Sequence, residues 1–463
     1  MMKAQSICSR AGLVIFMVAI SIPCTFAASN ASSDNPCRLE AIEYKGWKAQ
    51  QLSNHWLQLV VVPENGGRLM QVTFAGHSYL FVNPKLTGKY FPPSATDWFN
   101  YGGDKLWLLP EGNNDEQHWP GNSDVLDDGP YTFRNISEGK RCEIELTSPA
   151  DPQTGIQFIR TISIDSTSPK ISFHAEMKNV SGHGLDWSMQ SVSQYDTSRD
   201  PNSGQNTPIN PEFWTFTPAN PSSSYLNRYH VRFGPAENPE VDVREDGLFT
   251  VHYAHMAAEL WLDSTDGWLA VVDGTNKYAM VERFRYDPTK TYPGKASVIF
   301  WTNGTAARLN RDGVLTLPPD PDAGPYYLEA ELDSPMCRLR PGESCAMDTE
   351  WFPTRGEREF HGVTDAGILI RPLTAVASGT DQIKLSGSFG VFYPGHLVAR
   401  LYGAHAQPME VPIVDVSPTD QVVLDKEITC PGKCSRLSIH LTDNDGIDRG
   451  ALQEIRLSDQ AIH

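Results

Sequence analysis

Aromatic rings, an acid–base pair and a histidine are concentrated between residues 98 and 121. Binding sites for sugars combine aromatic rings, which stack on C–H faces, with carboxylates, amides and cations that hold the hydroxyl groups. The Gly102-Gly103 pair lets the backbone approach a ligand closely. The alternative is a structural loop whose tryptophans close the end of a sheet. The side chains suited to a sugar are Trp98, Asn100, Asp104, Lys105, Trp107, His118 and Trp119.

Two glutamates alternate with apolar residues in the segment Tyr327–Asp333. On a strand, Glu329 and Glu331 project from the same face, because successive side chains point to opposite faces. Two acids on an inner face are costly unless they serve a polar cleft. On a face that meets water they are ordinary solvated acids, and both alternatives stay open.

Two further places carry polar candidates. Gln190 and Gln194 are four residues apart in a strand-like segment, so they share a strand face. Arg68 directly follows the Gly66-Gly67 pair. Its alternative role is a surface charge at the exit of a turn.

The segments that must position these residues have the pattern of strands. Alternating or β-branched runs recur throughout, and turn-forming residues usually separate them. No long segment has the period of an amphipathic helix, which disfavours a parallel sheet with helices between its strands. We therefore expect an all-β protein built on a large antiparallel sandwich. Clear strand candidates are Leu57–Val62, Ile156–Ile164, Ile171–Met177, Tyr278–Arg285 and Tyr326–Leu332.

A polar, turn-rich stretch between residues 353 and 359 predicts a domain boundary. All 11 tryptophans precede this stretch. We expect a large sandwich over residues 38–353 and a small β-sandwich domain over residues 360–463. Because the second domain lacks tryptophan, it is a weak candidate for stacking on sugars. It is expected to pack or to bind a partner, which the sequence does not identify.

Residues 1–27 have the features of a cleavable signal peptide. Lys3 and Arg10 flank an apolar run, Ala11–Ile22, that is too short to span a bilayer. Small residues at Thr25 and Ala27 favour cleavage after Ala27. We expect a periplasmic or secreted protein, and no later stretch predicts a membrane span.

The chain is strongly acidic, with 38 Lys and Arg against 56 Asp and Glu and a formal net charge of −18. Such a protein is a poor candidate for nucleic acid or an anionic membrane surface, whereas neutral or cationic ligands remain open. No phosphate-binding glycine loop or dinucleotide fingerprint occurs. We expect no cofactor and no metal ion.

Six cysteines follow the predicted cleavage position. An even number in an exported protein predicts disulfides, with fifteen possible connectivities. Two pairs are close enough in sequence to be local, which leaves the other two cysteines for each other. The expected pairs are Cys337 with Cys345, Cys430 with Cys434, and Cys37 with Cys142. A metal site is the alternative for the second of these pairs.

Seven motifs stand in a characteristic order along the chain: Gly66–Leu69, Asn100–Trp107, Asn179–Trp187, Gly267–Ala270, Arg283–Phe284, Tyr292–Gly294 and Tyr327–Glu343. Through these motifs the chain resembles, over roughly residues 40–353, a bacterial family of unknown function with a galactose-mutarotase-like fold. The resemblance implies a β-supersandwich with one sugar-sized cleft across the concave sheet.

More distantly, the chain is similar to aldose 1-epimerases and hexose-6-phosphate mutarotases, in which His acts as general acid and Glu as general base. Glu331, or its neighbour Glu329, matches that base by position. His118 lies where one such His follows the glycine pair. Where the other His falls, this chain has Gln190 and Gln194.

Two functions of different class therefore remain open. In an aldose 1-epimerase-like enzyme, Glu331 would take the proton of the anomeric hydroxyl while His118 or Lys105 protonates the ring oxygen. In a non-catalytic carbohydrate-binding protein, the same residues would only hold the sugar. The expected partner of either is a mono- or oligosaccharide. The residues expected to bind it are Arg68, Asn100, Asp104, Lys105, Trp107, Trp119, Gln190 and Gln194.

Overall fold

The computed structural model describes residues 36–93, 99–111, 125–305, 308–309, 315–316, 324–379, 381–403, 408–430 and 434–457. Within these ranges the chain forms strands, and the helical elements are two short 3-10 turns, Pro201–Ser203 and Pro293–Lys295. The predicted all-β class is therefore confirmed. Trp98, His118 and Trp119 lie outside the described residues, as does the predicted signal peptide.

The larger sheet has 12 strands, and every pairing in it is antiparallel. Its strands follow one path, with β5 (His77–Ser78) beside β4 and β23 (Cys337–Leu339) beside β11. The path runs β1 (Arg38–Tyr44), β2 (Trp47–Ser53), β3 (Leu57–Val62), β4 (Arg68–Phe74), β6 (Asp104–Leu109), β11 (Leu185–Asp196), β22 (Tyr327–Asp333), β19 (Val298–Thr302), β16 (Ala258–Leu262) and β13 (His230–Phe233).

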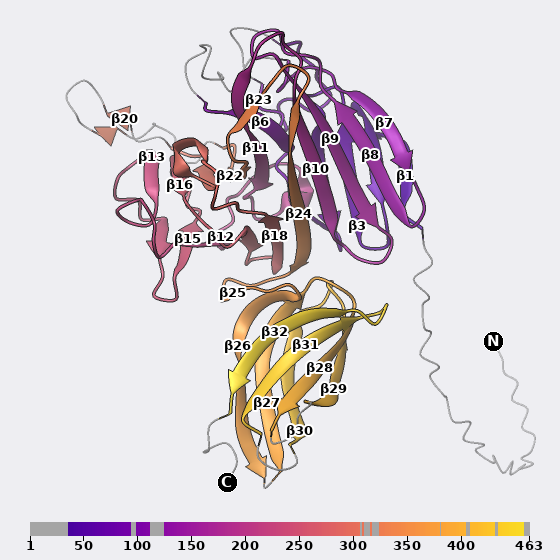
Figure 1. The fold of residues 1–463 in the computed structure, drawn as a ribbon, viewed down its shortest axis with the longest axis vertical. Coiled ribbons are helices and arrows are strands. Elements are labelled where there is room, and N and C mark those ends of the chain that lie inside the picture. Colours follow the sequence, from indigo (N-terminus) through magenta and orange to yellow (C-terminus); the bar gives the residue numbers. More distant parts are fainter. Residues whose placement is uncertain are drawn as a thin grey trace, which may run out of the picture. The chain divides into compact units, whose positions relative to one another are not determined.

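A second sheet of 10 antiparallel strands packs against the first (Figure 1). Its order is β14 (Val241–Val243), β15 (Leu248–His252), β12 (Phe213–Pro218), β17 (Trp268–Asp273), β18 (Tyr278–Phe284), β24 (Ser344–Arg355), β10 (Ile171–Asn179), β9 (Ile156–Asp165), β8 (Arg141–Thr147) and β7 (Thr132–Ser137).

The apolar core lies between these two sheets, because each strand directs alternate side chains inward. On β22 the core residues are Leu328, Ala330 and Leu332, all fully buried. From the facing sheet, β9 contributes Phe158 and Ile162 to the same cluster. The alternation therefore commits one face of each central strand to the core and leaves the other face for polar residues.

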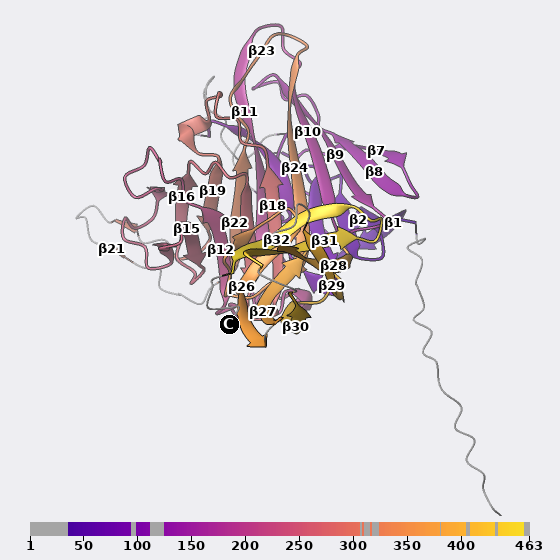
Figure 2. The same cartoon turned by 60° about the horizontal axis from the view of Figure 1, so that its bottom comes forward.

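Residues after β24 form two four-stranded sheets, coloured orange to yellow in Figures 1 and 2. One contains β25 (Gly362–Val363), β26 (Gly367–Gly379), β27 (Gln382–Val391) and β30 (Val422–Thr429). The other contains β29 (Met409–Val416), β28 (Gly395–Tyr402), β31 (Arg436–Asp443) and β32 (Asp448–Arg456). Earlier in the chain, before β22, a separate two-stranded sheet joins β20 (Arg308–Leu309) to β21 (Leu315–Thr316).

These small sheets enclose an apolar cluster of their own. A further cluster brings Phe352 of β24 together with Ile368 and Phe392 from beyond the predicted boundary. The division into domains at residues 353–360 stays a prediction.

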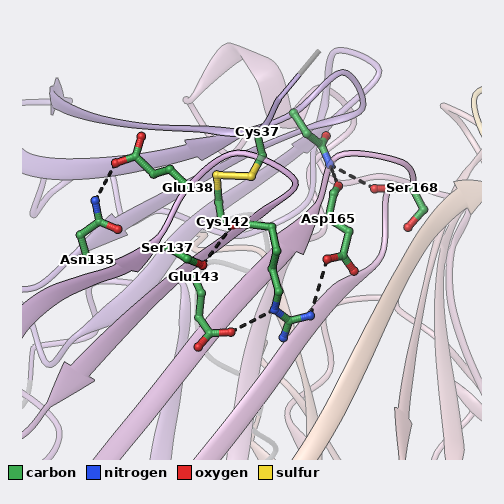
Figure 3. Close-up of a disulfide and its surroundings, with 10 residues drawn as sticks. Cys37, Asn135, Ser137, Glu138, Cys142, Glu143, Asp165 and Ser168 are labelled. Atoms are coloured by element: carbon green, nitrogen blue, oxygen red, sulfur yellow. Dashed lines mark hydrogen bonds and ion pairs between the residues drawn. A yellow bond between two sulfur atoms is a disulfide. The ribbon is translucent and has the colours of Figure 1, made fainter. Parts of the chain in front are cut away.

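The three expected disulfides are present in the structure. Cys37 pairs with Cys142 at a Cα–Cα distance of 5.8 Å and closes a separation of 105 residues (Figure 3). The others are Cys337–Cys345 and Cys430–Cys434, both with Cα–Cα distances of 6.5 Å. The alternative of a metal site at the last pair is therefore wrong.

The first disulfide anchors the start of the described chain to β8. Beside it, Arg141 forms ion pairs with Glu143 and Asp165 at 3.0 and 3.6 Å (Figure 3).

No helix of the described ranges is long and apolar enough to cross a membrane. In the same ranges, no three His, Cys, Asp or Glu side chains are grouped so as to hold a metal ion.

Replacing both members of a disulfide by serine should cost more stability for the long loop than for the short one. Cys37–Cys142 spans 105 residues and Cys430–Cys434 spans 4. In the chain-entropy account, the first bridge is worth about 5 kcal/mol and the second about 2 kcal/mol. Urea unfolding of the two double variants measures the difference. Equal losses would contradict this account.

Candidate functional site

A set of polar and charged side chains covers the face of the larger sheet that points away from the core. β6 contributes Lys105 and Trp107, which alternate with the core residues Leu106 and Leu108. β11, the next strand, contributes Gln190 and Gln194 on the face opposite its core residues Trp187 and Met189. β22 contributes Glu329, Glu331 and Asp333. We call this set the polar face.

The pairing register brings these residues into rows. Gln190 lies opposite Trp107 of β6 and Asp333 of β22. Gln194 lies opposite Glu329. Lys105 and Glu331 both lie opposite Val192 of β11, on either side of it. Residues more than 200 positions apart in sequence therefore meet on one surface.

The two glutamates are buried, each 6 % exposed, so they are not solvated surface acids. Each carboxylate accepts a hydrogen bond from a glutamine of β11. Gln190 Nε2 donates to Glu331 Oε2 at 2.6 Å, and Gln194 Nε2 donates to Glu329 Oε1 at 2.5 Å. The amides fix the positions of both carboxylates without supplying any charge.

The surroundings of the two carboxylates differ electrostatically. Burial raises the pKa of both, because it disfavours the charged form. For Glu331 the carboxylates Glu329 and Glu259 raise the pKa further, to well above its usual range. For Glu329 the charge of Lys105 partly offsets the effect of burial, and the pKa of this carboxyl stays above its usual value. The two carboxyl groups thus differ in their electrostatic neighbours, a cation for Glu329 and further carboxylates for Glu331.

A cationic part of the polar face adjoins Trp107. Lys105 Nζ lies 3.9 Å from the centre of the Trp107 ring, and burial lowers the pKa of this amine. Trp107 Nε1 donates to Asp127 Oδ1 at 2.9 Å, and Arg68 Nη2 reaches the same oxygen at 2.8 Å. Asp127 thus holds the indole and the guanidinium in place. Arg68 is fully buried and is not a surface charge.

The glycine pair before Arg68 has a steric reason. Gly66 and Gly67 both have positive φ, at 66° and 61°. A Cβ on Gly66 would overlap the Asp127 carbonyl oxygen, and one on Gly67 would overlap the Tyr131 ring. Only glycine permits the backbone to approach the Asp127 segment this closely.

Two strands beyond β22 extend the polar face with residues that the sequence analysis did not single out. On β19, Trp301 lies opposite Glu329, and on β16, Glu259 lies opposite Trp301. Trp261 Nε1 donates to Glu259 Oε1 at 2.6 Å. These side chains alternate with core residues, so the same alternation that revealed Glu329 and Glu331 could have found them. Figure 2 shows β16, β19 and β22 in succession.

Asp104 is not part of the polar face. It precedes Lys105 on β6 and therefore points to the other side, into the core. There it forms a buried ion pair with Arg160 of β9 and accepts hydrogen bonds from Ser191 and Ser193 at 3.3 and 3.2 Å. The short segment carrying Asp104 and Lys105 is a regular strand, so the two side chains are separated by the sheet.

Asn100 lies before β6 in a turn. Its Oδ1 accepts a hydrogen bond from the Gly102 amide at 3.1 Å. Of the residues expected to bind a sugar, the structure thus brings together Arg68, Lys105, Trp107, Gln190 and Gln194 with Glu329 and Glu331. It places Asp104 elsewhere.

Comparisons with known proteins show a distant likeness. No family model and no curated protein matches the chain. Among solved structures, a TPR-domain containing protein from Parabacteroides distasonis is 16 % identical, with a TM-score of 0.44 over 66 % of this chain and 47 % of the other. This chain thus spans about half the length of that protein.

Two other structures that the chain is similar to are galactose mutarotase-like proteins. The one from Clostridium acetobutylicum is 11 % identical, with a TM-score of 0.43 over 70 % of this chain and 99 % of the other. The one from Lactobacillus casei is 9 % identical, with a TM-score of 0.43 over 66 % of this chain and 99 % of the other.

A buried acid between the two sheets should make the stability of the protein depend on pH. Glu282 of β18 accepts a hydrogen bond from Tyr195 at 2.5 Å, and burial raises its pKa to about 8. Near pH 4.5 and below, both folded and unfolded chains carry the proton. As the pH rises to about 8, only the unfolded chain ionises, so this group should lower stability by on the order of 5 kcal/mol.

Glu282→Gln keeps an acceptor for Tyr195 and removes the ionisation. We expect its stability, measured by urea unfolding, to fall less between about pH 5 and about pH 8 than that of the wild type. Glu454→Gln, at an exposed position on β32, is the control and should keep the wild-type slope. An unchanged slope in Glu282→Gln would show that Glu282 is ionised in the folded protein.

Proposed function

We propose that the polar face binds a mono- or oligosaccharide and interconverts its anomers. One observation carries the proposal: Glu329 and Glu331 share a strand face, with Lys105 as a charged neighbour of Glu329 and further carboxylates as the neighbours of Glu331. Such a pair supplies an acid and a base at the same pH. The indole of Trp107 and the amides of Gln190 and Gln194 add the aromatic and polar surface that a sugar ring needs.

The proposed chemistry needs a proton removed at one atom and delivered at another. Glu329, beside Lys105, takes the proton of the anomeric hydroxyl. Glu331, which retains its proton among other carboxylates, donates it to the ring oxygen. The ring bond to the anomeric carbon breaks, an open-chain aldehyde forms, and reclosure on the other face returns both protons. These roles differ from those expected from the sequence, in which Glu331 was the base.

The second candidate function is binding without catalysis. The observation that favours it is that each glutamate is already engaged by a neutral glutamine amide. The same hydrogen bonds between glutamine and glutamate would be found in a site that only holds sugar hydroxyls and performs no reaction. The expected His118 acid lies outside the described residues, so its part stays a prediction.

Replacing Glu331 by Gln tests catalysis against binding. The amide keeps the shape and cannot donate the carboxylic proton, so anomer interconversion should fall about 100-fold or more. The measurement is NMR exchange spectroscopy on a panel of aldoses, with affinity followed by calorimetry. If Glu331→Gln interconverts the anomers of a bound sugar at the wild-type rate, the second candidate function, binding without catalysis, is favoured. A panel on which no sugar binds would overturn the proposed function itself.

Trp107→Ala should act in the opposite way. Loss of the ring should weaken sugar binding about tenfold or more, since base–aromatic stacking is worth about 1–3 kcal/mol. The rate at saturation should change less than the affinity. Trp214→Ala, at a partly buried indole of the other sheet, is the matched control and should bind sugar as the wild type does. Unchanged affinity in Trp107→Ala would exclude stacking on this ring.

We also propose that the chain acts outside the cytoplasm. The three disulfides support this, because such bonds persist in oxidising compartments. Expression in a bacterium with an intact export pathway should yield a mature protein that begins at Ala28, as mass spectrometry of the periplasmic fraction would show. Recovery of the full-length chain from the cytoplasm alone would contradict it.

A further inference from the structure

Strand β13, at one edge of the larger sheet, contains a β-bulge beside β16 (Figure 1). Val231 lies opposite Leu260 and packs against the core. The next paired residue of β13 is Phe233, opposite Glu259, so Arg232 is an additional residue in the strand. In a regular strand Phe233 would point to the core, as Val231 does two positions earlier. The bulge instead directs Phe233 to the polar face.

The Phe233 ring is only half covered on the polar face. It stacks on Trp301 of β19, with the ring centres 5.6 Å apart and an angle of 28° between the planes. Phe233 nevertheless stays 43 % exposed. Trp301 therefore covers one side of the ring, and the other side meets solvent. A large apolar side chain that is turned away from the core and left exposed beside a polar surface marks a place of contact with a ligand.

Groups that can hold hydroxyls lie beside Phe233. Arg232 is exposed, and its guanidinium lies 5.8 Å from the centre of the Trp261 ring. Glu259 accepts a hydrogen bond from Trp261 Nε1 at 2.6 Å. Burial raises the pKa of Glu259 and the charge of Arg232 opposes that effect, so these two groups are neighbours. An open aromatic face next to a guanidinium and a carboxyl group suits a sugar ring, which offers C–H faces and hydroxyls.

This group of side chains lies apart from the two glutamates of the proposed reaction. Glu329, Trp301, Glu259 and Phe233 form one row across β22, β19, β16 and β13. Neighbouring strands are about 4.8 Å apart, so three spacings place the backbone of Phe233 about 14 Å from that of Glu329. A sugar ring held over β22 therefore leaves Phe233 to a further ring of the same ligand.

We propose that the ligand of the polar face is an oligosaccharide, with its reducing end at Glu329 and Glu331 and a further ring stacked on Phe233. Arg232 and Glu259 hold hydroxyls of the stacked ring. The reducing end must lie at the two glutamates because only a free anomeric carbon can interconvert. This inference rests on the proposed function, since it assumes that the polar face is where a sugar binds.

The first experiment varies the length of the sugar chain. Calorimetry compares glucose with cellobiose and cellotetraose, mannose with mannobiose and mannotetraose, and xylose with xylobiose and xylotetraose. In a series that binds, we expect the tetrasaccharide to bind about tenfold or more tighter than the monosaccharide, the gain that one ring stacked on an aromatic side chain implies. Equal affinities at every length would overturn the oligosaccharide inference and leave the proposed function standing. No binding in any series would overturn both.

Variants then locate the stacked ring. In Phe233→Ala the gain in affinity with chain length should disappear, while the affinity for the monosaccharide stays unchanged. Ile136→Ala, at a side chain 39 % exposed on β7 of the other sheet, is the control and should keep the gain. If circular dichroism shows that Phe233→Ala does not fold, Phe233→Leu, which keeps an apolar side chain over Trp301, takes its place. A folded variant that retains the full gain would overturn the assignment.

The alternative occupant of this edge is a second copy of the chain, because an edge strand can pair with a strand of another molecule. Light scattering on the wild type and on Phe233→Ala measures the mass in solution. We expect the same mass for both proteins. A wild-type dimer that Phe233→Ala dissociates would assign the exposed ring to contact between chains and overturn the oligosaccharide inference.

Discussion

The alternation of side chains along β6, β11 and β22 is the constraint on which the rest of the structure depends. These strands are neighbours in the larger sheet, and each buries one face in the core. Because the period of a strand is two, every residue between two core residues must project from the other face. The polar face is thus the obligatory reverse side of an apolar pattern, and its composition is free to serve a ligand.

Burying acids on that reverse side is costly, and the structure shows how the cost is limited. Two glutamine amides accompany Glu329 and Glu331, and Lys105 opposes the burial of Glu329. Asp333, which is 1 % exposed, lies opposite Gln190 of β11, whose amide lowers the pKa of this carboxyl against the larger effect of burial.

How far the sequence predicts this arrangement depends on the range of the interactions. Alternation within Tyr327–Asp333 was enough to place both glutamates on one face, and cysteine spacing was enough for the disulfides. Trp261 and Trp301 follow the same short-range pattern and could have been recognised. The ion pair of Asp104 with Arg160 joins two sheets, and no local pattern indicates such a partner. The sequence analysis expected Asp104 and Lys105 at the same sugar, whereas the alternation of the strand Asp104–Leu109 places them on opposite faces.

That ion pair also explains why Lys105 is where it is. Asp104 and Lys105 are adjacent, so a slip of β6 by one residue would exchange their faces. The slip would leave the Arg160 guanidinium, only 2 % exposed, without its carboxylate and would place the Lys105 amine beside it in the core. Breaking a buried pair in this way costs several kcal/mol, whereas the correct register satisfies Arg160 and sets Lys105 over Trp107. The charge pair inside the core therefore fixes the position of the cation on the polar face, although the two lie on opposite sides of the sheet.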